Sequence, residues 1–369
     1  MTILHRAAAM LLGSIAATFA LSAAPANAAD MPKLADLNPG WTTMEPGGET
    51  ACATGTPYSF HVKPGEGADA EKLLIFLNGG GACWTGDQCD IESEPTPYVP
   101  FAHMPENTPQ DRTGIFDLDN PENPVAKWTQ VFAPYCTGDV HIGNRDVTYT
   151  NTDGKEVTIR HRGRKNAEAV LAWVYANVEK PERILVAGSS AGAIATPLHA
   201  ADVAKHYPDT DIIAYADGAG GYRDATIAGL IENWGFWDGA PDWTDAIARD
   251  TATFEEIDRA AAAQAPTMRF AEYDSAYDAV QEMFLRLLGN EERLYPLLQK
   301  NRDELAEAIP SFRAYTARGT EHTLLRYDRF YTYEEEGVTT RDWLADLIAG
   351  EEIESVTCGE PEACEKEPD

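Results

Sequence analysis

The stretch Ile184-Leu185-Val186-Ala187-Gly188-Ser189-Ser190-Ala191-Gly192 decides how this chain is expected to fold. Its first four residues form a short apolar run, which is typical of a strand buried on both faces of a sheet. The last five fit the pattern G-x-S-x-G, in which a strand turns sharply into a helix and lifts the central serine onto an exposed corner. A base can reach the hydroxyl there, so the stretch predicts a serine hydrolase with Ser190 as the nucleophile.

Other short apolar runs repeat the strand pattern, and each ends in a polar or glycine-rich turn: 73–77, 131–133, 212–216, 268–273 and 312–316. Helical patterns lie between them, at 167–178, 191–206, 279–288 and 291–308. This alternation predicts an α/β fold, a mostly parallel sheet with helices on both faces, in a single domain at 29–369. The tryptophan-rich helical segment 222–266 would either cap the pocket as an insertion or form a separate packing cluster.

The N-terminal segment predicts export. Residues 1–28 combine a short basic start, an apolar stretch and the small-x-small sequence Ala26-Asn27-Ala28, as in a secretory signal peptide. The apolar stretch is short and rich in Ala and Gly, which disfavours a transmembrane anchor. We therefore expect cleavage after Ala28 and a soluble mature protein. The formal net charge of −31 argues against nucleic acids and anionic membrane surfaces as partners.

The six cysteines predict disulfides, because an even number of cysteines in an exported protein indicates pairing. The short spacings favour two local pairs and leave one long-range pair: Cys83 with Cys89, Cys358 with Cys364, and Cys52 with Cys136. A zinc site is the competing interpretation. It is disfavoured because no C-x-x-C pair occurs.

A serine nucleophile needs a base, and three histidines follow Ser190 in the chain. Strand-turn-helix hydrolases have the order serine, acid, histidine, which restricts the base to these three. His199 and His206 lie on a helix that is expected to run away from the nucleophile. His322 lies in a turn directly after the predicted strand 312–316, and ligand chemistry gathers at the carboxyl ends of strands in such folds. His322 is therefore the predicted base.

The acid should follow an earlier strand, and three aspartates do so. Asp274 ends the run 268–273 and is favoured by its position, whereas Asp278 would open the next helix. Asp217 ends the run 212–216, where its alternative role is to brace the following glycine turn. These local patterns leave the acid undecided.

The donors for an oxyanion are predicted in Asn78-Gly79-Gly80-Gly81, which follows the first long apolar run. Glycines let backbone N–H groups approach a ligand closely, and such a loop is the usual partner of the amide after the nucleophile, here Ala191. A phosphate-binding loop would need a following Lys-Ser/Thr pair, which is missing. No metal or cofactor is expected for this chemistry.

Several ordered motifs make the chain resemble the pectin acetylesterase family, which includes the Notum-type carboxylesterases. They are LNGGGACW (77–84), PYCTGDVHIGN (134–144), GSSAG (188–192), DGAGGY (217–222), AYDAVQ (276–281) and GTEH (319–322). The resemblance extends from Cys52 to the region of Cys358. It implies an α/β-hydrolase-like fold and a Ser-Asp-His triad that cleaves carboxylic esters.

The resemblance also assigns the acid. The acid of the family lies in an A-Y-D-x-x-Q pattern, which matches residues 276–281 and selects Asp278 over Asp274. The same comparison carries the nucleophile to Ser190 and the base to His322. It places the oxyanion hole at Gly80, Gly81 and Ala191.

Three residues depart from the family pattern: Ala82 replaces a tryptophan of plant members, Ser189 a cysteine, and His141 an aromatic residue. His141 either lines the pocket or packs in the core. With so negative a charge, pectin is not assumed as the substrate. The ester could carry an acetyl group on a polysaccharide, or a longer acyl chain if the aromatic residues at 234–243 form an apolar pocket. A non-catalytic binding protein on a hydrolase scaffold is the hypothesis from another class.

Overall fold

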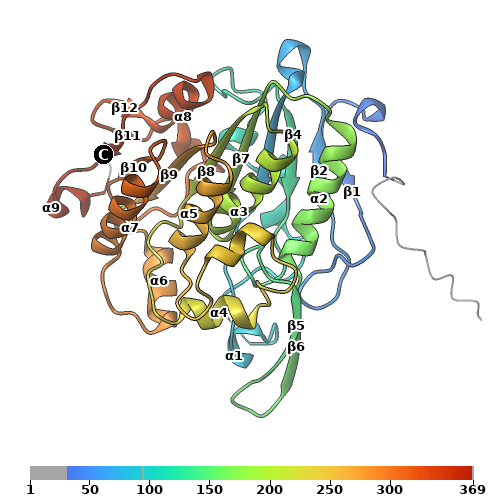
Figure 1. The fold of residues 1–369 in the computed structure, drawn as a ribbon, viewed down its shortest axis with the longest axis vertical. Coiled ribbons are helices and arrows are strands. Elements are labelled where there is room, and N and C mark those ends of the chain that lie inside the picture. The colour runs from blue at the N-terminus through green and yellow to red at the C-terminus, as the bar shows by residue number, and fades with distance from the viewer. Residues whose placement is uncertain (1–30, 94, 368–369) are drawn as a thin grey trace, which may run out of the picture.

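A computed structural model describes residues 31–93 and 95–367, so the predicted signal peptide at 1–28 lies outside the described residues (Figure 1). A nine-stranded sheet has the order β1-β2-β4-β3-β7-β8-β9-β10-β13. Strand β2 pairs antiparallel with β1 and β4, and every other neighbouring pair is parallel. The strands are β1 (Thr42–Met44), β2 (Phe60–Lys63), β3 (Lys72–Leu77), β4 (Thr129–Ala133), β7 (Arg183–Ser189), β8 (Asp211–Asp217), β9 (Arg269–Ser275), β10 (Arg313–Ala317) and β13 (Val356–Thr357).

Helices alternate with these strands along the chain (Figure 1). They are α1 (Gly86–Cys89), α2 (Gly163–Asn177), α3 (Ala191–His206), α4 (Ile227–Asn233), α5 (Phe254–Gln264), α6 (Ala279–Leu288), α7 (Leu294–Ala308), α8 (Thr340–Ala349) and α9 (Pro361–Cys364). Two antiparallel ribbons stand apart from the sheet, β5 (Arg145–Thr150) with β6 (Glu156–His161) and β11 (Glu334–Glu335) with β12 (Val338–Thr339). The β5–β6 ribbon projects from one end of the molecule (Figure 1).

The sheet is buried on both faces, as the apolar runs predict. Along β3, Leu73, Ile75 and Leu77 belong to one buried cluster, whereas Leu74 and Phe76 belong to another. Successive side chains of a strand point to opposite faces, so the two clusters are the two sides of the sheet. The first cluster contains side chains of α2 to α7, and the second contains those of α8. The expected α/β fold, a mostly parallel sheet covered by helices, is confirmed.

The element boundaries agree closely with the sequence patterns, with two exceptions. The helices predicted at 191–206 and 279–288 are α3 and α6, whereas α7 begins at residue 294 rather than 291 and α2 begins at residue 163 rather than 167. The backbone N–H of Gly163 donates to Oδ2 of Asp139 at 2.7 Å. A carboxylate from a distant turn therefore starts α2 early, which local periodicity does not reveal.

The three disulfides have the expected pairing: Cys52–Cys136, Cys83–Cys89 and Cys358–Cys364. Segment 222–266 contains α4 and α5, and many of its apolar side chains belong to the larger core cluster. Among the described residues, no helix combines the length and apolar character that crossing a membrane requires.

Candidate active site

Ser190 occupies the sharp turn between β7 and α3. Its backbone has φ 55° and ψ −121°, a conformation that is strained for any residue with a Cβ. The surrounding structure holds this turn, because Ser190 N donates to the carbonyl of Asp217 at 2.8 Å and Ser189 Oγ donates to Oδ2 of the same residue at 2.5 Å. A Cβ at Gly192 would collide with the carbonyl of Leu77, so only glycine lets α3 begin this close to β3.

His322 and Asp278 meet beside this turn. His322 Nδ1 lies 2.6 Å from Oδ2 of Asp278. Asp278 is fully buried at the start of α6, where its Oδ1 accepts the N–H groups of Val280 at 2.9 Å and Gln281 at 3.0 Å. The helix cap thus fixes the carboxylate, and the carboxylate fixes the imidazole. Ser190 and His322 line the same groove.

Asp274, which position alone favoured as the acid, serves another purpose. Its Oδ2 lies 2.8 Å from Nη2 of Arg302, and its Oδ1 accepts from Gln281 Nε2 at 2.6 Å and from Gly220 N at 3.0 Å. Gln281 Nε2 also donates to Oδ2 of Asp278, at 3.1 Å. Asp274 is therefore part of a buried network behind Asp278, and no hydrogen bond joins it to His322.

Asp217 links the turn that contains Ser190 to the loop after His322. Besides Ser189, its carboxylate accepts the backbone N–H groups of Leu324 at 2.9 Å and Leu325 at 3.1 Å. Burial raises the pKa of Asp217 to about 6. The hydrogen bonds stabilise the charged carboxylate and so limit this rise. The carboxylate thus braces the segment that follows His322 rather than the glycine turn after β8.

The glycine loop packs directly on the turn that contains Ser190. A Cβ at Gly79 would lie 2.6 Å from the carbonyl oxygen of Ser189 and 2.8 Å from Cβ of Ser190. Gly81 has φ +75°, and a Cβ there would overlap the carbonyl of Pro97. Asn78 anchors the loop through Asn107 Oδ1 at 2.8 Å. The loop therefore needs glycine for two reasons, the positive φ at Gly81 and the close contact of Gly79 with the Ser190 turn. Both are expected for a loop that presents N–H groups to a ligand.

An apolar pocket opens beside Ser190. Its wall comes from α3, segment 222–266 and α6, together with the glycine loop. The apolar and glycine residues that line it are Gly81, Ala82, Trp84, Val140, Ala191, Ile194, Tyr222, Ile227, Leu230, Trp234, Phe254, Phe284 and Leu288. No charged side chain reaches this pocket among the described residues, so it suits a hydrocarbon group.

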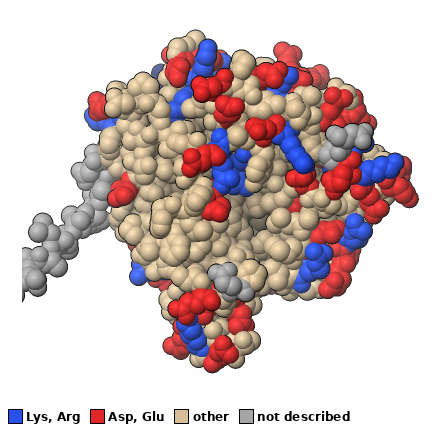
Figure 2. Space-filling model, turned by 180° about the vertical axis from the view of Figure 1, so that it is seen from behind, with Lys and Arg blue, Asp and Glu red and all other residues tan. Residues whose placement is uncertain are grey.

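A larger open groove passes over Ser190 and His322. The four large apolar side chains that are most exposed in the described part of the chain all line it: Ile91, Met283, Leu287 and Tyr327. On the face drawn in Figure 2, uncharged side chains cover a large continuous area, and acidic side chains lie mainly around its edges. At Ile91, Met283, Leu287 and Tyr327 the groove therefore exposes apolar surface in a chain whose net charge is −31.

The family model for pectinacetylesterase matches residues 43–230. The chain belongs to the pectinacetylesterase family. Within it, pectin acetylesterase 4 of Arabidopsis thaliana is 25% identical over 170 residues, which are 45% of this chain and 40% of the relative. Palmitoleoyl-protein carboxylesterase notum1a of Danio rerio is 29% identical over 157 residues, 42% of this chain and 29% of the relative. The chain thus spans less than half the length of these two relatives.

A third relative shows that membership of the pectinacetylesterase family does not by itself imply activity. The inactive palmitoleoyl-protein carboxylesterase notum1b of Danio rerio is 33% identical over 100 residues, 26% of this chain and 68% of the relative. The family match contains the glycine loop and Ser190 but ends before Asp278 and His322. The contact between Asp278 at the start of α6 and His322 after β10 therefore lies outside the matched region.

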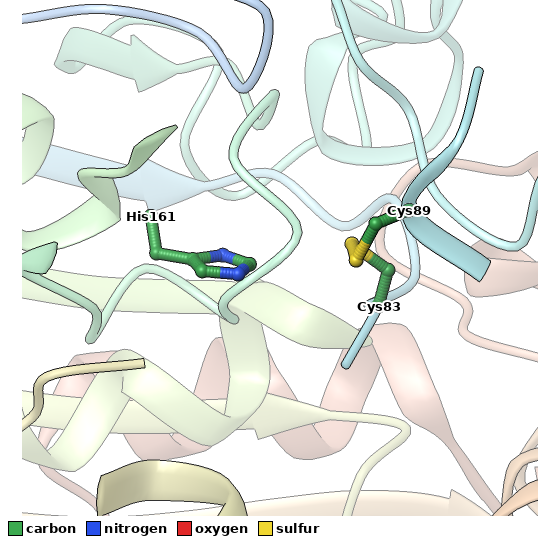
Figure 3. A group of neighbouring side chains, drawn as sticks. All are labelled: Cys83, Cys89 and His161. Atoms are coloured by element: carbon green, nitrogen blue, oxygen red, sulfur yellow. A yellow bond between two sulfur atoms is a disulfide. The ribbon is translucent and has the colours of Figure 1, made fainter. Parts of the chain in front are cut away.

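One group of side chains has the composition of a metal site, namely Cys83, Cys89 and His161 (Figure 3). The two sulfurs are joined in a disulfide, so neither offers a thiolate. The imidazole of His161 is held by the carbonyl of Thr137 at 2.9 Å and the hydroxyl of Tyr149 at 2.8 Å. Burial lowers the pKa of His161 to about 4. These contacts make the group a structural support for the β5–β6 ribbon.

Three further histidines have structural contacts, and two of them are buried. His141 is 1% exposed, and its Nε2 lies 2.8 Å from the carbonyl of Asn78, so it supports the glycine loop from behind rather than lining the pocket. His199 is equally buried against the carbonyl of His141, at 3.0 Å. His206 stacks on Tyr175, with ring centroids 3.8 Å apart. This leaves His322 as the histidine of the three after Ser190 that lines the groove.

Sequence reasoning missed Arg112 and Arg326, which also line the groove. Arg326 Nη1 donates to Oδ1 of Asn78 at 2.7 Å and so contacts the glycine loop. Arg326 follows His322 by four residues, and its position after a predicted base was the available signal. Arg112 lies far from every catalytic motif in the sequence, so nothing local marks it.

Proposed function

We propose that this protein is an exported serine esterase that hydrolyses carboxylic esters through an acyl-enzyme. It belongs to a family of carboxylesterases, and the proposal adds the nucleophile, the mechanism and the compartment. The observation that carries it is the 2.6 Å contact between His322 Nδ1 and Asp278 Oδ2 in the groove that contains Ser190. Three disulfides support export, because such bonds persist in oxidising compartments.

In the first step, His322 Nε2 takes the proton of Ser190 as Oγ attacks the ester carbonyl. Asp278 holds the Nδ1–H tautomer and stabilises the imidazolium that forms. The N–H groups of Gly80, Gly81 and Ala191 stabilise the oxyanion. His322 then protonates the leaving alcohol, and water attacks the acyl-enzyme by the reverse proton path, which releases the acid and restores Ser190.

The apolar pocket favours an acyl group longer than acetyl. Its wall is uncharged and consists mainly of large apolar side chains, which suit a hydrocarbon chain. The alternative, an acetyl group on a polysaccharide, agrees with the name pectin acetylesterase 4 of the Arabidopsis thaliana relative. The name palmitoleoyl-protein carboxylesterase notum1a agrees with the longer chain. Segment 222–266 then acts as a cap that forms part of the acyl pocket.

The test is a series of p-nitrophenyl esters from acetate to palmitate, run beside acetylated polysaccharides. We expect kcat/KM to rise beyond acetate and then to fall once the chain exceeds the pocket. Release of acetate from the polymers alone would favour the polysaccharide substrate instead. The Ser190→Ala variant should be inactive and folded, and full turnover by it would refute the nucleophile.

Labelling with a fluorophosphonate separates an enzyme from a binding protein on the same scaffold. An activated Ser190 should be labelled in the wild-type protein and not in Ser190→Ala. If the wild-type protein stays unlabelled and hydrolyses no ester, the binding-protein hypothesis replaces the proposed function.

A further inference from the structure

Two arginines on the groove wall have no acidic partner. Arg112 and Arg326 line the groove with Ser190 and His322. Neither forms a salt bridge with another residue in the described part of the chain, although the protein has 60 acidic and 29 basic residues. In so acidic a chain, most cations find a carboxylate. Two neighbouring cations without one therefore need an explanation.

Arg326 is the more buried of the two, at 7% exposure. Its Nη1 donates to Asn78, its Nε has no partner, and no described residue accepts a hydrogen bond from Nη2. Burial lowers the pKa of Arg326, and Arg112 repels its charge. The guanidinium also lies 5.8 Å from the ring of Tyr327, which compensates the charge only in part. A buried cation with this few partners is costly.

The carboxylate that attracts Arg326 does not neutralise it by direct contact. Asp217 attracts Arg326 through space, but its oxygens are occupied by Ser189 and by the N–H groups of Leu324 and Leu325. Asp217 therefore offers no acceptor to Nη2 of the Arg326 guanidinium. An anion that enters the groove could bind there.

Arg112 is half-buried and only weakly attached. Its Nη2 lies 3.5 Å from the carbonyl of Pro105, and its Nε has no partner. Among the described residues two acids line the groove, and neither forms an ion pair with Arg112. Asp87 accepts from the N–H of Thr152 at 3.0 Å and from its hydroxyl at 2.9 Å, and Glu106 is exposed to solvent. The arginines thus provide a local positive site in an acidic protein.

We propose that Arg112 and Arg326 form a binding site for a carboxylate or sulfate group on the alcohol part of the ester substrate. The inference rests on the proposed esterase function. Guanidinium forks match the planar geometry of such anions and bind them through paired hydrogen bonds. The anion belongs to the alcohol part because neither arginine lines the apolar pocket that would hold the acyl chain. The substrate would then be apolar on one side of Ser190 and acidic on the other.

The kinetic test uses two acetate esters that differ only in charge, 3-acetoxybenzoate and 3-acetoxybenzamide. We expect the wild-type protein to prefer the carboxylate in kcat/KM. Arg112→Gln should reduce that preference about tenfold, as expected for the loss of one charge-assisted hydrogen bond. Arg249→Gln is the matched control, since Arg249 is exposed, lies over the ring of Trp237 at 5.0 Å and is outside the groove. An unchanged preference in Arg112→Gln would overturn the proposal.

Calorimetry with the Ser190→Ala protein gives a readout that does not depend on turnover. The carboxylate should bind more tightly than the amide, and adding Arg326→Lys should weaken its binding because lysine keeps the charge but loses the fork. Thermal unfolding of each variant identifies loss of the fold. If the wild-type protein hydrolyses neither these acetates nor any p-nitrophenyl ester of the series, the proposed function fails, while the binding preference still decides the anion site.

Inorganic sulfate distinguishes a substrate group from a free anion. Sulfate should compete with 3-acetoxybenzoate for Ser190→Ala, and this competition should weaken in the Arg112→Gln background. Tight sulfate binding together with equal affinity for the two esters would overturn the assignment to the substrate.

Discussion

Replacing Asp278 by asparagine separates the two tasks of this side chain. In one orientation the amide oxygen keeps the position of Oδ1 and still accepts the N–H groups of Val280 and Gln281. The amide NH₂ then faces His322 Nδ1, so the imidazole must carry its proton on Nε2. A ring in that tautomer cannot accept the proton of Ser190.

The opposite orientation keeps the base but sacrifices the helix cap. Both cap N–H groups would then face the amide NH₂, which loses two buried hydrogen bonds, roughly 2 kcal/mol at about 1 kcal/mol each. The first orientation keeps a bond to His322, because the amide NH₂ donates to Nδ1. It loses only the bond that Gln281 Nε2 donates to Oδ2, and Gln281 Nε2 keeps Asp274 Oδ1 as a partner. We therefore expect the first orientation, which keeps the helix cap, to be the more stable one by about 1 kcal/mol.

The expected result for Asp278→Asn is a fall in kcat of about 10⁴-fold, the size known for the same change in a serine protease triad, with a small loss of stability. The assay is turnover of a p-nitrophenyl ester beside thermal unfolding. Thr339→Ala is the control, because it removes the cap of α8, where Thr339 Oγ1 accepts from Asp342 N at 3.0 Å, on the opposite face of the sheet. It should cost about 1 kcal/mol of stability and leave turnover unchanged. Near-normal kcat with lowered stability in Asp278→Asn would refute the reasoning.

Three other outcomes are expected. Gly79→Ala should lower kcat at least about tenfold, because its Cβ would lie 2.8 Å from Cβ of Ser190 and displace the nucleophile; unchanged kcat in a folded variant would contradict this. Leu230→Phe should narrow the apolar pocket and lower the ratio of octanoate to acetate hydrolysis about tenfold, and an unaltered ratio would move the acyl site elsewhere. Burial lowers the pKa of His199 from 6.5 to about 4, so its contribution to stability is lost as pH falls from about 6.5 toward 4. In His199→Gln the drop in unfolding free energy between pH 7 and pH 5 should be smaller by about 2 kcal/mol, measured by urea titration; an equal drop would show that His199 takes up its proton in the folded state.

Continuous apolar runs made the sheet predictable. The runs at 184–187 and 212–216 lie in β7 and β8, and the nucleophile turn follows from G-x-S-x-G because glycine at Gly188 and Gly192 permits close packing with the helix and strand. The start of α2 could not be predicted from the sequence. It depends on the carboxylate of Asp139, which lies in another loop and accepts the N–H of Gly163. Local periodicity describes one element at a time and contains no such long-range contact.

The acid shows the same limit within the candidate site. Asp274 and Asp278 both follow β9, and position alone favours the first. The deciding contacts come from elsewhere, since Arg302 on α7 binds Asp274 while the loop after β10 brings His322 to Asp278. Only the family pattern could anticipate this pairing. Arg112 had no such pattern to identify it.

The carboxylate of Asp217 has a consequence for any attempt to redesign this protein. It is hydrogen-bonded both to Ser189, next to Ser190, and to Leu324 and Leu325, just beyond His322. Two segments that are remote in sequence are therefore held by hydrogen bonds to the same carboxylate, and neither can be shifted alone. Evolution or engineering that repositions the base must also accommodate the nucleophile turn, so productive changes at this end of the sheet should arise as compensating pairs.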